Sequence, residues 1–273
     1  MFVAPLQLLE SVFSVLFPSE CRLCQTSLNE ISRIPVCREC LAEIRPTRVP
    51  QCILCGDRLP PATLLMGDGR CWTCRDSAPE FDRALSFGEY LAGLRGLIHL
   101  LKYEGVTPVA APLGRMLART MTELAGSADA APLVIPVPLH KSRRRSRGFN
   151  QAELLARAAV RHLPLKPEVL NGALVRQRDT VSQVGLSREE RIQNVRDAFR
   201  VAQPSRVKGR DILLVDDVMT TGTTLSECAR VLKRAGAQRV WAATVARAFE
   251  GASPAAADPR EQEDIEVAAA TLV

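Results

Sequence analysis

Residues 210–225, with the sequence RDILLVDDVMTTGTTL, constrain the fold of this chain more than any other segment. Their first half is an aliphatic run with the length and composition of a buried strand. Two carboxylates, Asp216 and Asp217, follow it, and then comes a turn of threonines around Gly222. Residues 225–235 have the composition of a helix, which a glycine ends. The segment therefore predicts a strand, an acidic pair, a short loop and the N-terminus of a helix.

This predicted unit favours a ligand that carries both phosphate and hydroxyl groups. The N–H groups at the start of a helix point at such a ligand, and the helix dipole favours negative charge. Threonine hydroxyls add donors for phosphate oxygens, while two adjacent carboxylates can accept hydrogen bonds from vicinal hydroxyls. Phosphate and diol together suggest a ribose 5-phosphate. The alternative is a purely structural turn with a threonine as the helix N-cap.

The segment resembles the motif with which type I phosphoribosyltransferases bind phosphoribosyl pyrophosphate (PRPP): a hydrophobic strand, two acidic residues and a TGxT turn. The resemblance implies that Asp216 and Asp217, the catalytic candidates, bind the ribose 2′- and 3′-hydroxyls. It also implies that the turn wraps the 5′-phosphate. The predicted PRPP-binding residues are Asp216, Asp217, Met219, Thr220, Thr221, Gly222, Thr223 and Thr224.

Eight of the nine cysteines form four C-x-x-C pairs within residues 18–80. Twelve residues separate the first two pairs and fifteen separate the last two, which is the spacing of zinc ribbons. Two such turns supply the four corners of a tetrahedral site, so about two structural zinc ions are expected. The predicted ligands are Cys21, Cys24, Cys37, Cys40, Cys52, Cys55, Cys71 and Cys74. Sequential pairing is preferred, and an interleaved pairing of the first pair with the third stays open.

Free buried cysteines are one alternative to metal ligation, and a redox C-x-x-C is another, although its βαβ context is missing. Paired cysteines in this pattern indicate metal and a reducing compartment rather than disulfides. Because so short a segment buries little apolar surface, we expect the metal to supply its folding energy. Cys228 is expected to be an ordinary buried thiol of the helix at 225–235.

The two ends of the chain differ in composition from the remainder. Residues 1–17 are apolar, but Glu10 interrupts them and no basic stretch precedes them, so neither a signal peptide nor membrane insertion is expected. Their apolar side chains recur at helical spacing, which predicts an amphipathic helix packed on the neighbouring module. Residues 250–273 are rich in alanine and acids and predict a disordered tail. The formal charge of +6 fits partners that carry phosphate but does not demonstrate nucleic-acid binding.

A strongly basic segment lies between a predicted strand at 133–137 and a predicted helix at 151–162. Five of the seven residues from Lys141 to Arg147 are basic. This is the edge at which α/β sheets bind ligands, and in type I phosphoribosyltransferases the loop at this place holds the pyrophosphate of PRPP. The candidates are Lys141, Arg143, Arg144, Arg145 and Arg147. A solvated basic loop and a nucleic-acid patch remain open.

Residues 172–201 predict two short strands around a polar stretch. Phosphoribosyltransferases of this type carry a long loop here that folds over the site and excludes water, so we predict a lid at 176–195. The alternative is an exposed hairpin with a helical turn from Ser187 to Asn194, in which Ser187 and Glu190 form a capping box.

In this order the segments resemble the ComF family of competence-type phosphoribosyltransferase-like proteins, over about residues 5–248. The resemblance implies an α/β protein with the type I phosphoribosyltransferase fold, a mainly parallel sheet flanked by helices, behind an N-terminal zinc-ribbon module. The expected division is an amphipathic helix at 1–17, a double zinc ribbon at 18–80, a phosphoribosyltransferase-like domain at 81–249 and a tail at 250–273.

The same resemblance implies a cytoplasmic protein that acts in DNA uptake or nucleotide-related metabolism. PRPP and Mg²⁺ are its implied ligands, and single-stranded DNA and the competence helicase machinery its implied partners. Three hypotheses follow: a phosphoribosyltransferase whose acceptor is unknown, a single-stranded nucleic-acid-binding protein, and a PRPP sensor without turnover.

Overall fold

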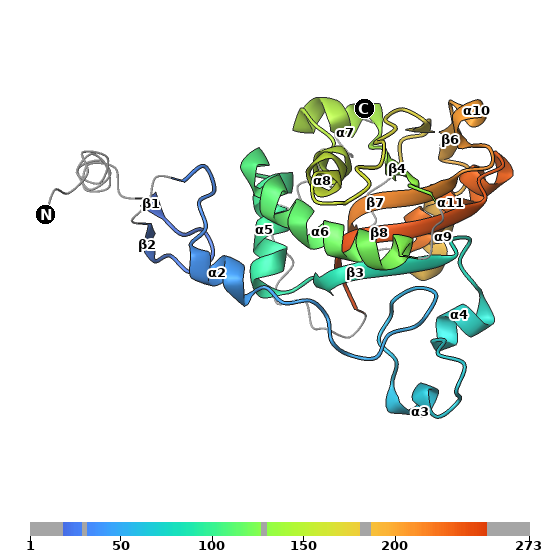
Figure 1. Ribbon diagram of the computed structural model, residues 1–273, viewed down its shortest axis with the longest axis horizontal. Coiled ribbons are helices and arrows are strands. Elements are labelled where there is room, and N and C mark those ends of the chain that lie inside the picture. The colour runs from blue at the N-terminus through green and yellow to red at the C-terminus, as the bar shows by residue number, and fades with distance from the viewer. Residues whose placement is uncertain (1–18, 29–31, 127–129, 181–186, 250–273) are drawn as a thin grey trace, which may run out of the picture.

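The computed structural model describes residues 19–28, 32–126, 130–180 and 187–249 (Figure 1). The helix predicted at 1–17 and the tail predicted at 250–273 lie outside the described residues. In the described part of the chain, no helix has the length and apolar character that a membrane crossing requires.

A four-stranded parallel sheet forms the centre of the molecule. Its strands lie in the order β3 (Arg83–Glu89), β8 (Arg239–Arg247), β7 (Asp211–Met219) and β4 (Leu133–Pro136). All three pairings are parallel. The predicted mainly parallel sheet is confirmed.

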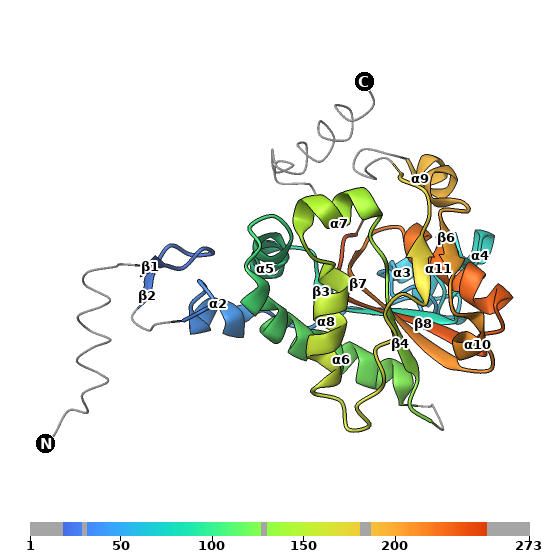
Figure 2. The same cartoon turned by 90° about the horizontal axis from the view of Figure 1, so that it is seen from above.

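Side chains alternate between the two faces of this sheet, and helices cover both faces (Figure 2). Leu213 and Val215 of β7 belong to a core shared with α5 (Ala92–Lys102), α6 (Ala110–Ala125) and α8 (Gln151–Val160). A short 3₁₀ turn, η1 (Thr107–Val109), precedes α6. Ile212 and Leu214 belong to a second core with α11 (Thr223–Arg234). Because β7 is covered on both faces, its first half is a continuous run of aliphatic residues.

The eight paired cysteines form two groups in sequential pairing, Cys21, Cys24, Cys37 and Cys40 and then Cys52, Cys55, Cys71 and Cys74. The interleaved pairing is therefore excluded. We call these groups, with their surrounding turns, the first and second ribbon. The first contains β1 (Ser19–Glu20), β2 (Ser27–Leu28) and α2 (Arg38–Glu43), and the second contains α3 (Pro61–Leu64) and α4 (Trp72–Asp76).

The two ribbons pack on opposite faces of the sheet. Leu23 of the first ribbon lies against Gly93 and Gly96 of α5, and this ribbon shares the core of α5, α6 and α8. The second ribbon shares the core of α11, and the N–H of Ala84 in β3 donates to the carbonyl of Leu54 at 2.7 Å. The second ribbon thus also contacts the edge strand β3 through a backbone hydrogen bond.

A small antiparallel pair of strands, β5 (Leu174–Arg176) and β6 (Phe199–Val201), stands beside the main sheet. Between the two strands lies α9 (Arg188–Val195), whose capping box of Ser187 and Glu190 is the one that the alternative interpretation, an exposed hairpin with a helical turn, includes. A single turn, α10 (Pro204–Val207), leads from β6 to β7. Residues 181–186 of the predicted lid lie outside the described residues.

The basic segment predicted as a loop is a helix, α7 (Lys141–Arg147). Arginine and lysine are good helix formers, and the side chain of His140 accepts a hydrogen bond from the N–H of Ser142 as N-cap. Gly148 ends the helix at a φ of 81°, and its N–H donates to the carbonyl of Arg144. The loop prediction was therefore wrong for these seven residues.

A second correction concerns the acidic pair. Asp216 and Asp217 lie inside β7 and not after it, because the strand continues to Met219. Its pairing with β8 extends through Asp216 opposite Thr244 to Met219 opposite Arg247. The carboxylates are therefore held on a hydrogen-bonded strand, which fixes their direction more firmly than a loop would.

Candidate functional site

The acidic pair and α7 meet at the carboxyl edge of the sheet. Strand β4 pairs in parallel with β7 up to Pro136 opposite Val215. Both strands end at the same edge, where the chain leaves β4 toward α7 and leaves β7 toward α11. In open α/β sheets this edge is the usual place for ligands.

The threonine turn at the start of α11 has the geometry of a phosphate cradle. Gly222 is its N-cap at a φ of 77° and takes the place that the alternative gave to a threonine. A Cβ at Gly222 would lie 2.5 Å from Cε of Met219. The hydroxyls of Thr221 and Thr223 lie 2.7 Å apart. Met219 itself is 2% exposed, and its buried side chain packs against Gly222 of the turn.

Asp217 forms an ion pair that no motif in the sequence predicts. Its Oδ2 lies 2.7 Å from Nζ of Lys102, at the end of α5. Burial opposes the charge of this lysine, but the Asp217 carboxylate raises the pKa of Lys102 above its ordinary value. A lysine in the last turn of a helix is common because it complements the helix dipole, so no sequence signal distinguished it.

Asp216 has a different environment from its neighbour. Its carboxylate accepts a hydrogen bond from the N–H of Asp217 at 2.9 Å. Burial and the adjacent Asp217 carboxylate raise the pKa of Asp216 to about 8. Asp217 is thus the ion-pair partner of Lys102, whereas Asp216 retains its proton to a higher pH than an ordinary aspartate.

An aromatic cluster borders Lys102. The Tyr90 hydroxyl and His99 Nε2 lie 2.8 Å apart, and His99 packs edge-on to Tyr103. His99 is a half-buried, hydrogen-bonded histidine. The guanidinium of Arg147 lies 5.7 Å from the centre of the Tyr103 ring, which connects this cluster to α7.

The structure separates the five basic residues of α7 into two groups. Arg143 and Arg147 are half-buried. Arg143 donates to the carbonyl of Thr180 at 3.1 Å, and Arg147 donates to the side chain of Gln151 at 2.9 Å. The other three, Lys141, Arg144 and Arg145, are exposed.

Arg176, at the end of β5, is a second residue that the candidate set missed. Its guanidinium lies 5.3 Å from the centre of the Phe199 ring and donates to the hydroxyl of Thr180. Its Nε is buried and has no hydrogen-bond partner. Burial and the neighbouring Arg143 lower the pKa of Arg176 to about 10.

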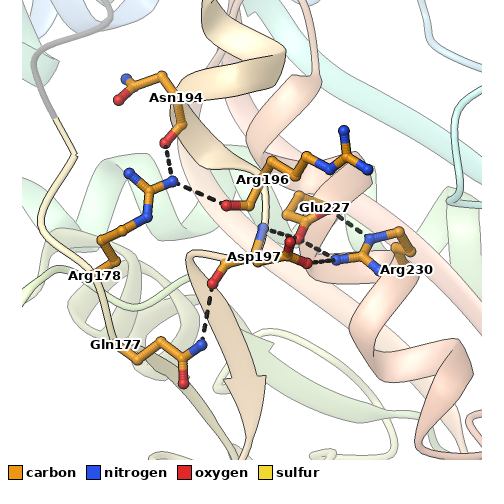
Figure 3. A network of polar contacts seen from close by, with 7 residues as sticks. All are labelled: Gln177, Arg178, Asn194, Arg196, Asp197, Glu227 and Arg230. Carbon is orange, nitrogen blue, oxygen red and sulfur yellow. Dashed lines mark hydrogen bonds and ion pairs between the residues drawn. The ribbon is translucent and has the colours of Figure 1, made fainter.

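A network of polar contacts fastens the base of the predicted lid to α11 (Figure 3). Arg230 lies 2.8 Å from Asp197 and 2.6 Å from Glu227, and Glu227 accepts from the N–H of Asp197 at 2.9 Å. Arg178 donates to the carbonyls of Asn194 and Arg196, both at 2.9 Å. The C-terminal end of the segment is therefore tied to the helix that carries the threonine turn, and Arg178 ties the N-terminal end to the C-terminal end.

The two cysteine groups fit structural zinc. Within each group the four Sγ atoms lie within 4.8 Å of one another, and four thiolates leave no open position for chemistry. Burial opposes ionisation of Cys21, but hydrogen bonds from the N–H groups of Cys37 and others lower the pKa of its thiol to about 6. In the second ribbon, Arg247 donates to the carbonyl of Cys55 at 2.7 Å.

The second ribbon also reaches the threonine turn. A cavity of about 480 Å³ lies between them, lined on one side by Cys55 and Phe81 and on the other by residues 220–223. The N–H of Glu80 donates to the hydroxyl of Ser226 at 3.0 Å. The ribbon thus forms one wall beside the candidate phosphate cradle.

The parallel sheet, with its carboxyl-edge acidic pair and threonine turn, defines the class: a protein with a phosphoribosyltransferase domain. The family model described as "Phosphoribosyl transferase domain" matches residues 150–270. The DNA utilization protein YhgH of Salmonella typhi is 34% identical over 82% of this chain and 94% of its own length. Competence protein F of Haemophilus influenzae is 31% identical over 85% of this chain and 98% of its own length. The chain therefore belongs to the ComF family, as the sequence predicted.

Competence protein ComFC of Bacillus subtilis is a more distant relative, 27% identical over 74% of this chain and 79% of its own length. Among solved structures, phosphoribosylpyrophosphate synthetase from Mycobacterium smegmatis matches 56% of this chain and 37% of its own. Its identity is 17% and the TM-score is 0.31.

Proposed function

We propose that this chain binds PRPP with Mg²⁺ at the carboxyl edge of its sheet. The observation that carries the proposal is the junction of β7 and α11. There, a strand-held pair of carboxylates, Asp216 and Asp217, runs into a glycine-capped threonine turn at the start of a twelve-residue helix. This junction offers acceptors for ribose hydroxyls and donors for a 5′-phosphate within one short segment.

Each part of the proposed site has a chemical role. The N–H groups and hydroxyls of Thr220 to Thr224 hold the 5′-phosphate, and Asp216 and Asp217 orient the ribose. The cations of α7 hold the pyrophosphate, and Mg²⁺ is bound mainly by oxygens of PRPP and by water. In a transfer reaction the acceptor would form a bond to C1 of the ribose while the C1–O bond to pyrophosphate breaks, and these cations would stabilise the charge that develops on the departing pyrophosphate.

The names of the relatives suggest the setting of this activity. They are a DNA utilization protein and competence proteins. We therefore propose a role in DNA uptake or in nucleotide-related metabolism, in the cytoplasm, with the competence helicase machinery as a partner. The division of the chain at residues 18–80 and 81–249 is part of the same proposal.

Pyrophosphate release tests whether binding leads to transfer. Purified protein is incubated with PRPP, Mg²⁺ and a panel of nucleobases and amines, and the Asp216→Asn/Asp217→Asn variant serves as the control. Release that depends on one acceptor and on the acidic pair identifies a phosphoribosyltransferase. A rise in melting temperature with PRPP but no release with any acceptor identifies a PRPP sensor. If the wild type shows neither pyrophosphate release nor a rise in melting temperature with PRPP, the proposal is contradicted.

A second candidate function, single-stranded DNA binding, is favoured by the surface of the second ribbon. Trp72 is 55% exposed, and the guanidinium of Arg75 lies 5.4 Å from the centre of its ring. An exposed aromatic ring beside an arginine is suited to stacking of an unpaired base. Gel shifts of Trp72→Ala at several salt concentrations test this function, and unchanged binding by the variant contradicts it.

A further inference from the structure

Arg247, the last residue of β8, is a buried arginine in contact with the second ribbon. It is only 4% exposed. Its Nη1 donates to the carbonyl of Cys55 at 2.7 Å, and its Nη2 lies 3.9 Å from Sγ of the same cysteine. Arg247 and Cys55 are 192 positions apart in the sequence. The contact therefore joins the end of a sheet strand directly to one of the four thiolate candidates of the second ribbon.

The charge of Arg247 is poorly compensated by the carboxylates around it. Its Nη2 lies 3.6 Å from Oδ2 of Asp57, whose side chain is 35% exposed, and this distance is too long for a hydrogen bond. Its Nε is buried and has no hydrogen-bond partner. Burial of a guanidinium is costly unless an opposite charge lies close to it. The environment of Arg247 therefore calls for more negative charge on the side of the ribbon.

The metal centre of the second ribbon supplies charge of the required sign. Four thiolates on one zinc ion carry a net charge of about −2, and Cys55 is the ligand that Arg247 touches. Cysteines without a metal are mostly neutral at neutral pH, since an ordinary thiol has a pKa of about 8.5. The contact is therefore favourable when the ribbon holds zinc and costly when it does not.

The backbone of Arg247 leads to the threonine turn. Arg247 lies opposite Met219 in the parallel pairing of β8 with β7, and the N–H of Ala248 donates to the carbonyl of Met219 at 2.9 Å. Cε of Met219 lies 2.5 Å from the position that a Cβ at Gly222 would occupy. Arg247 also lines the cavity between the ribbon and the turn. One short series of contacts thus connects the metal centre with Gly222.

We propose that Arg247 is a positioning residue that couples the metal centre of the second ribbon to the threonine turn, so that zinc in the ribbon and PRPP at the turn strengthen each other's binding. The inference rests on the proposed function for the identity of the ligand at the turn. With zinc bound, Arg247 is held against Cys55, and the paired ends of β8 and β7 keep Met219 against Gly222. Without zinc, Arg247 loses its counter-charge and the turn loses this support.

A purely structural role of Arg247 makes a different prediction. A residue that only fastens the ribbon to the sheet affects stability, but it does not link two binding events. A coupling between two sites is reciprocal, so each ligand changes the affinity of the other by the same factor. The first ribbon is an internal reference, because it packs on the opposite face of the sheet from the second ribbon.

The test is equilibrium competition for zinc between the full-length protein and a zinc-selective chelator, in excess Mg²⁺, with and without PRPP. We expect PRPP to raise the zinc affinity of the second ribbon about tenfold, within the usual range of such couplings, and to leave that of the first ribbon unchanged. Cys24→Ser and Cys74→Ser, each with one intact ribbon, assign the two affinities. Asp216→Asn/Asp217→Asn should show no change with PRPP, which excludes chelation of zinc by PRPP itself.

Variants of Arg247 test the link itself. Arg247→Gln should reduce the coupling to less than about twofold, because it removes the charge that contacts the metal centre. Arg247→Lys keeps the charge and should retain part of the coupling. Arg161→Gln, at an exposed arginine after α8, should retain all of it. Melting temperatures show which variants are folded, and if Arg247→Gln is not, Arg247→Lys and the wild type decide.

Calorimetric titration of PRPP measures the reciprocal effect. Zinc-loaded Cys24→Ser should bind PRPP about tenfold more tightly than the same variant after zinc is withdrawn by the chelator, because the two factors of one coupling are equal. In Cys24→Ser/Arg247→Gln the two affinities should be nearly equal.

The outcomes separate this inference from the proposed function. If the wild type binds PRPP but the zinc affinity of its second ribbon does not change, the coupling is wrong and the proposed function stands. A change of the same size in both ribbons, or full coupling in Arg247→Gln, also overturns the role of Arg247. If the zinc-loaded wild type does not bind PRPP, both the inference and the proposed function are wrong.

Discussion

At the scale of single residues, the two adjacent aspartates of β7 differ in exposure and in ion pairing. Asp217 is 3% exposed and paired with Lys102. Asp216 is only half-buried and has no such partner at ion-pair distance among the described residues. Ionising two neighbouring carboxylates at a buried edge is costly, and Lys102 forms an ion pair with Asp217.

Lys102→Met should lower the free energy of unfolding by about 3 kcal/mol, because it leaves the buried Asp217 carboxylate without a counter-charge. The two side chains are 16% and 5% exposed, so solvent compensates little. Urea unfolding near neutral pH measures the change. Lys208→Met, at an exposed lysine, is the control and should lie within about 0.5 kcal/mol of the wild type. A double variant with Asp217→Asn should recover part of the loss, and equal effects of Lys102→Met and Lys208→Met would contradict this reading.

The raised pKa of Asp216 predicts a pH dependence of stability. The ordinary pKa is 3.8 and the folded-state value is about 8, so between these values the folded state binds more protons than the unfolded state. Stability contributed by protonated Asp216 is therefore lost as the pH rises through this window. Asp216→Asn cannot lose a proton, so its stability relative to the wild type should increase from about pH 6 to about pH 8. A difference that does not change with pH would show that Asp216 has an ordinary pKa.

At the scale of elements, the junction of β7 and α11 was predictable and α7 was not. The aliphatic run of β7, the acidic pair and Gly222 are local signals, and each has one physical explanation. Residues 141–147 have no apolar periodicity, so the sequence does not distinguish an exposed basic helix from a basic loop. The contacts that decide it, such as those of His140 and Ser142 with Asp179, join residues about forty positions apart.

The residues near the candidate site that the sequence did not predict share one property: tertiary contacts bring them there. Lys102, Arg176 and His140 lie in separate segments and form no motif with the acidic pair. A single sequence contains no pairing information of this kind. The cysteine pairs were the opposite case, because their spacing alone specifies the metal geometry.

The network in Figure 3 predicts that α11 holds the base of the segment at 177–197. Glu227→Ala should lower the free energy of unfolding by about 1–3 kcal/mol, because Arg230 and the N–H of Asp197 lose a buried acceptor. Amide hydrogen exchange should accelerate at Asp197 and the start of β6 and stay unchanged in β7. Glu43→Ala, at an exposed glutamate, is the matched control. Uniform acceleration across the sheet would contradict a local anchoring role.

At the scale of the whole molecule, the two ribbons have unequal importance for the sheet. The second ribbon is bonded to β3, contacts Arg247 at the end of β8 and borders the threonine turn. The first ribbon packs on α5, and its Cys24 is exposed, whereas all four cysteines of the second ribbon are buried. Loss of metal from the second ribbon should therefore disturb the structure of the candidate site directly.

Metal analysis of the wild type should give about two zinc ions per chain, and about one in Cys74→Ser or in Cys24→Ser. Cys74→Ser should lower the melting temperature more than Cys24→Ser, because its ribbon completes the core over α11. Circular dichroism during heating measures both. Equal losses of stability in the two variants would contradict the unequal roles of the ribbons, and about one zinc in the wild type would mean that one group does not bind metal.

The central claim is recognition of PRPP by the junction of β7 and α11, and calorimetric titration of PRPP in the presence of Mg²⁺ tests it most directly. The wild type is predicted to bind one PRPP per chain, with affinity that falls when Mg²⁺ is removed. Asp216→Asn/Asp217→Asn is predicted to abolish binding while Arg161→Gln retains it. No heat of binding in the folded, zinc-loaded wild type, or equal binding by the double variant, would contradict the claim.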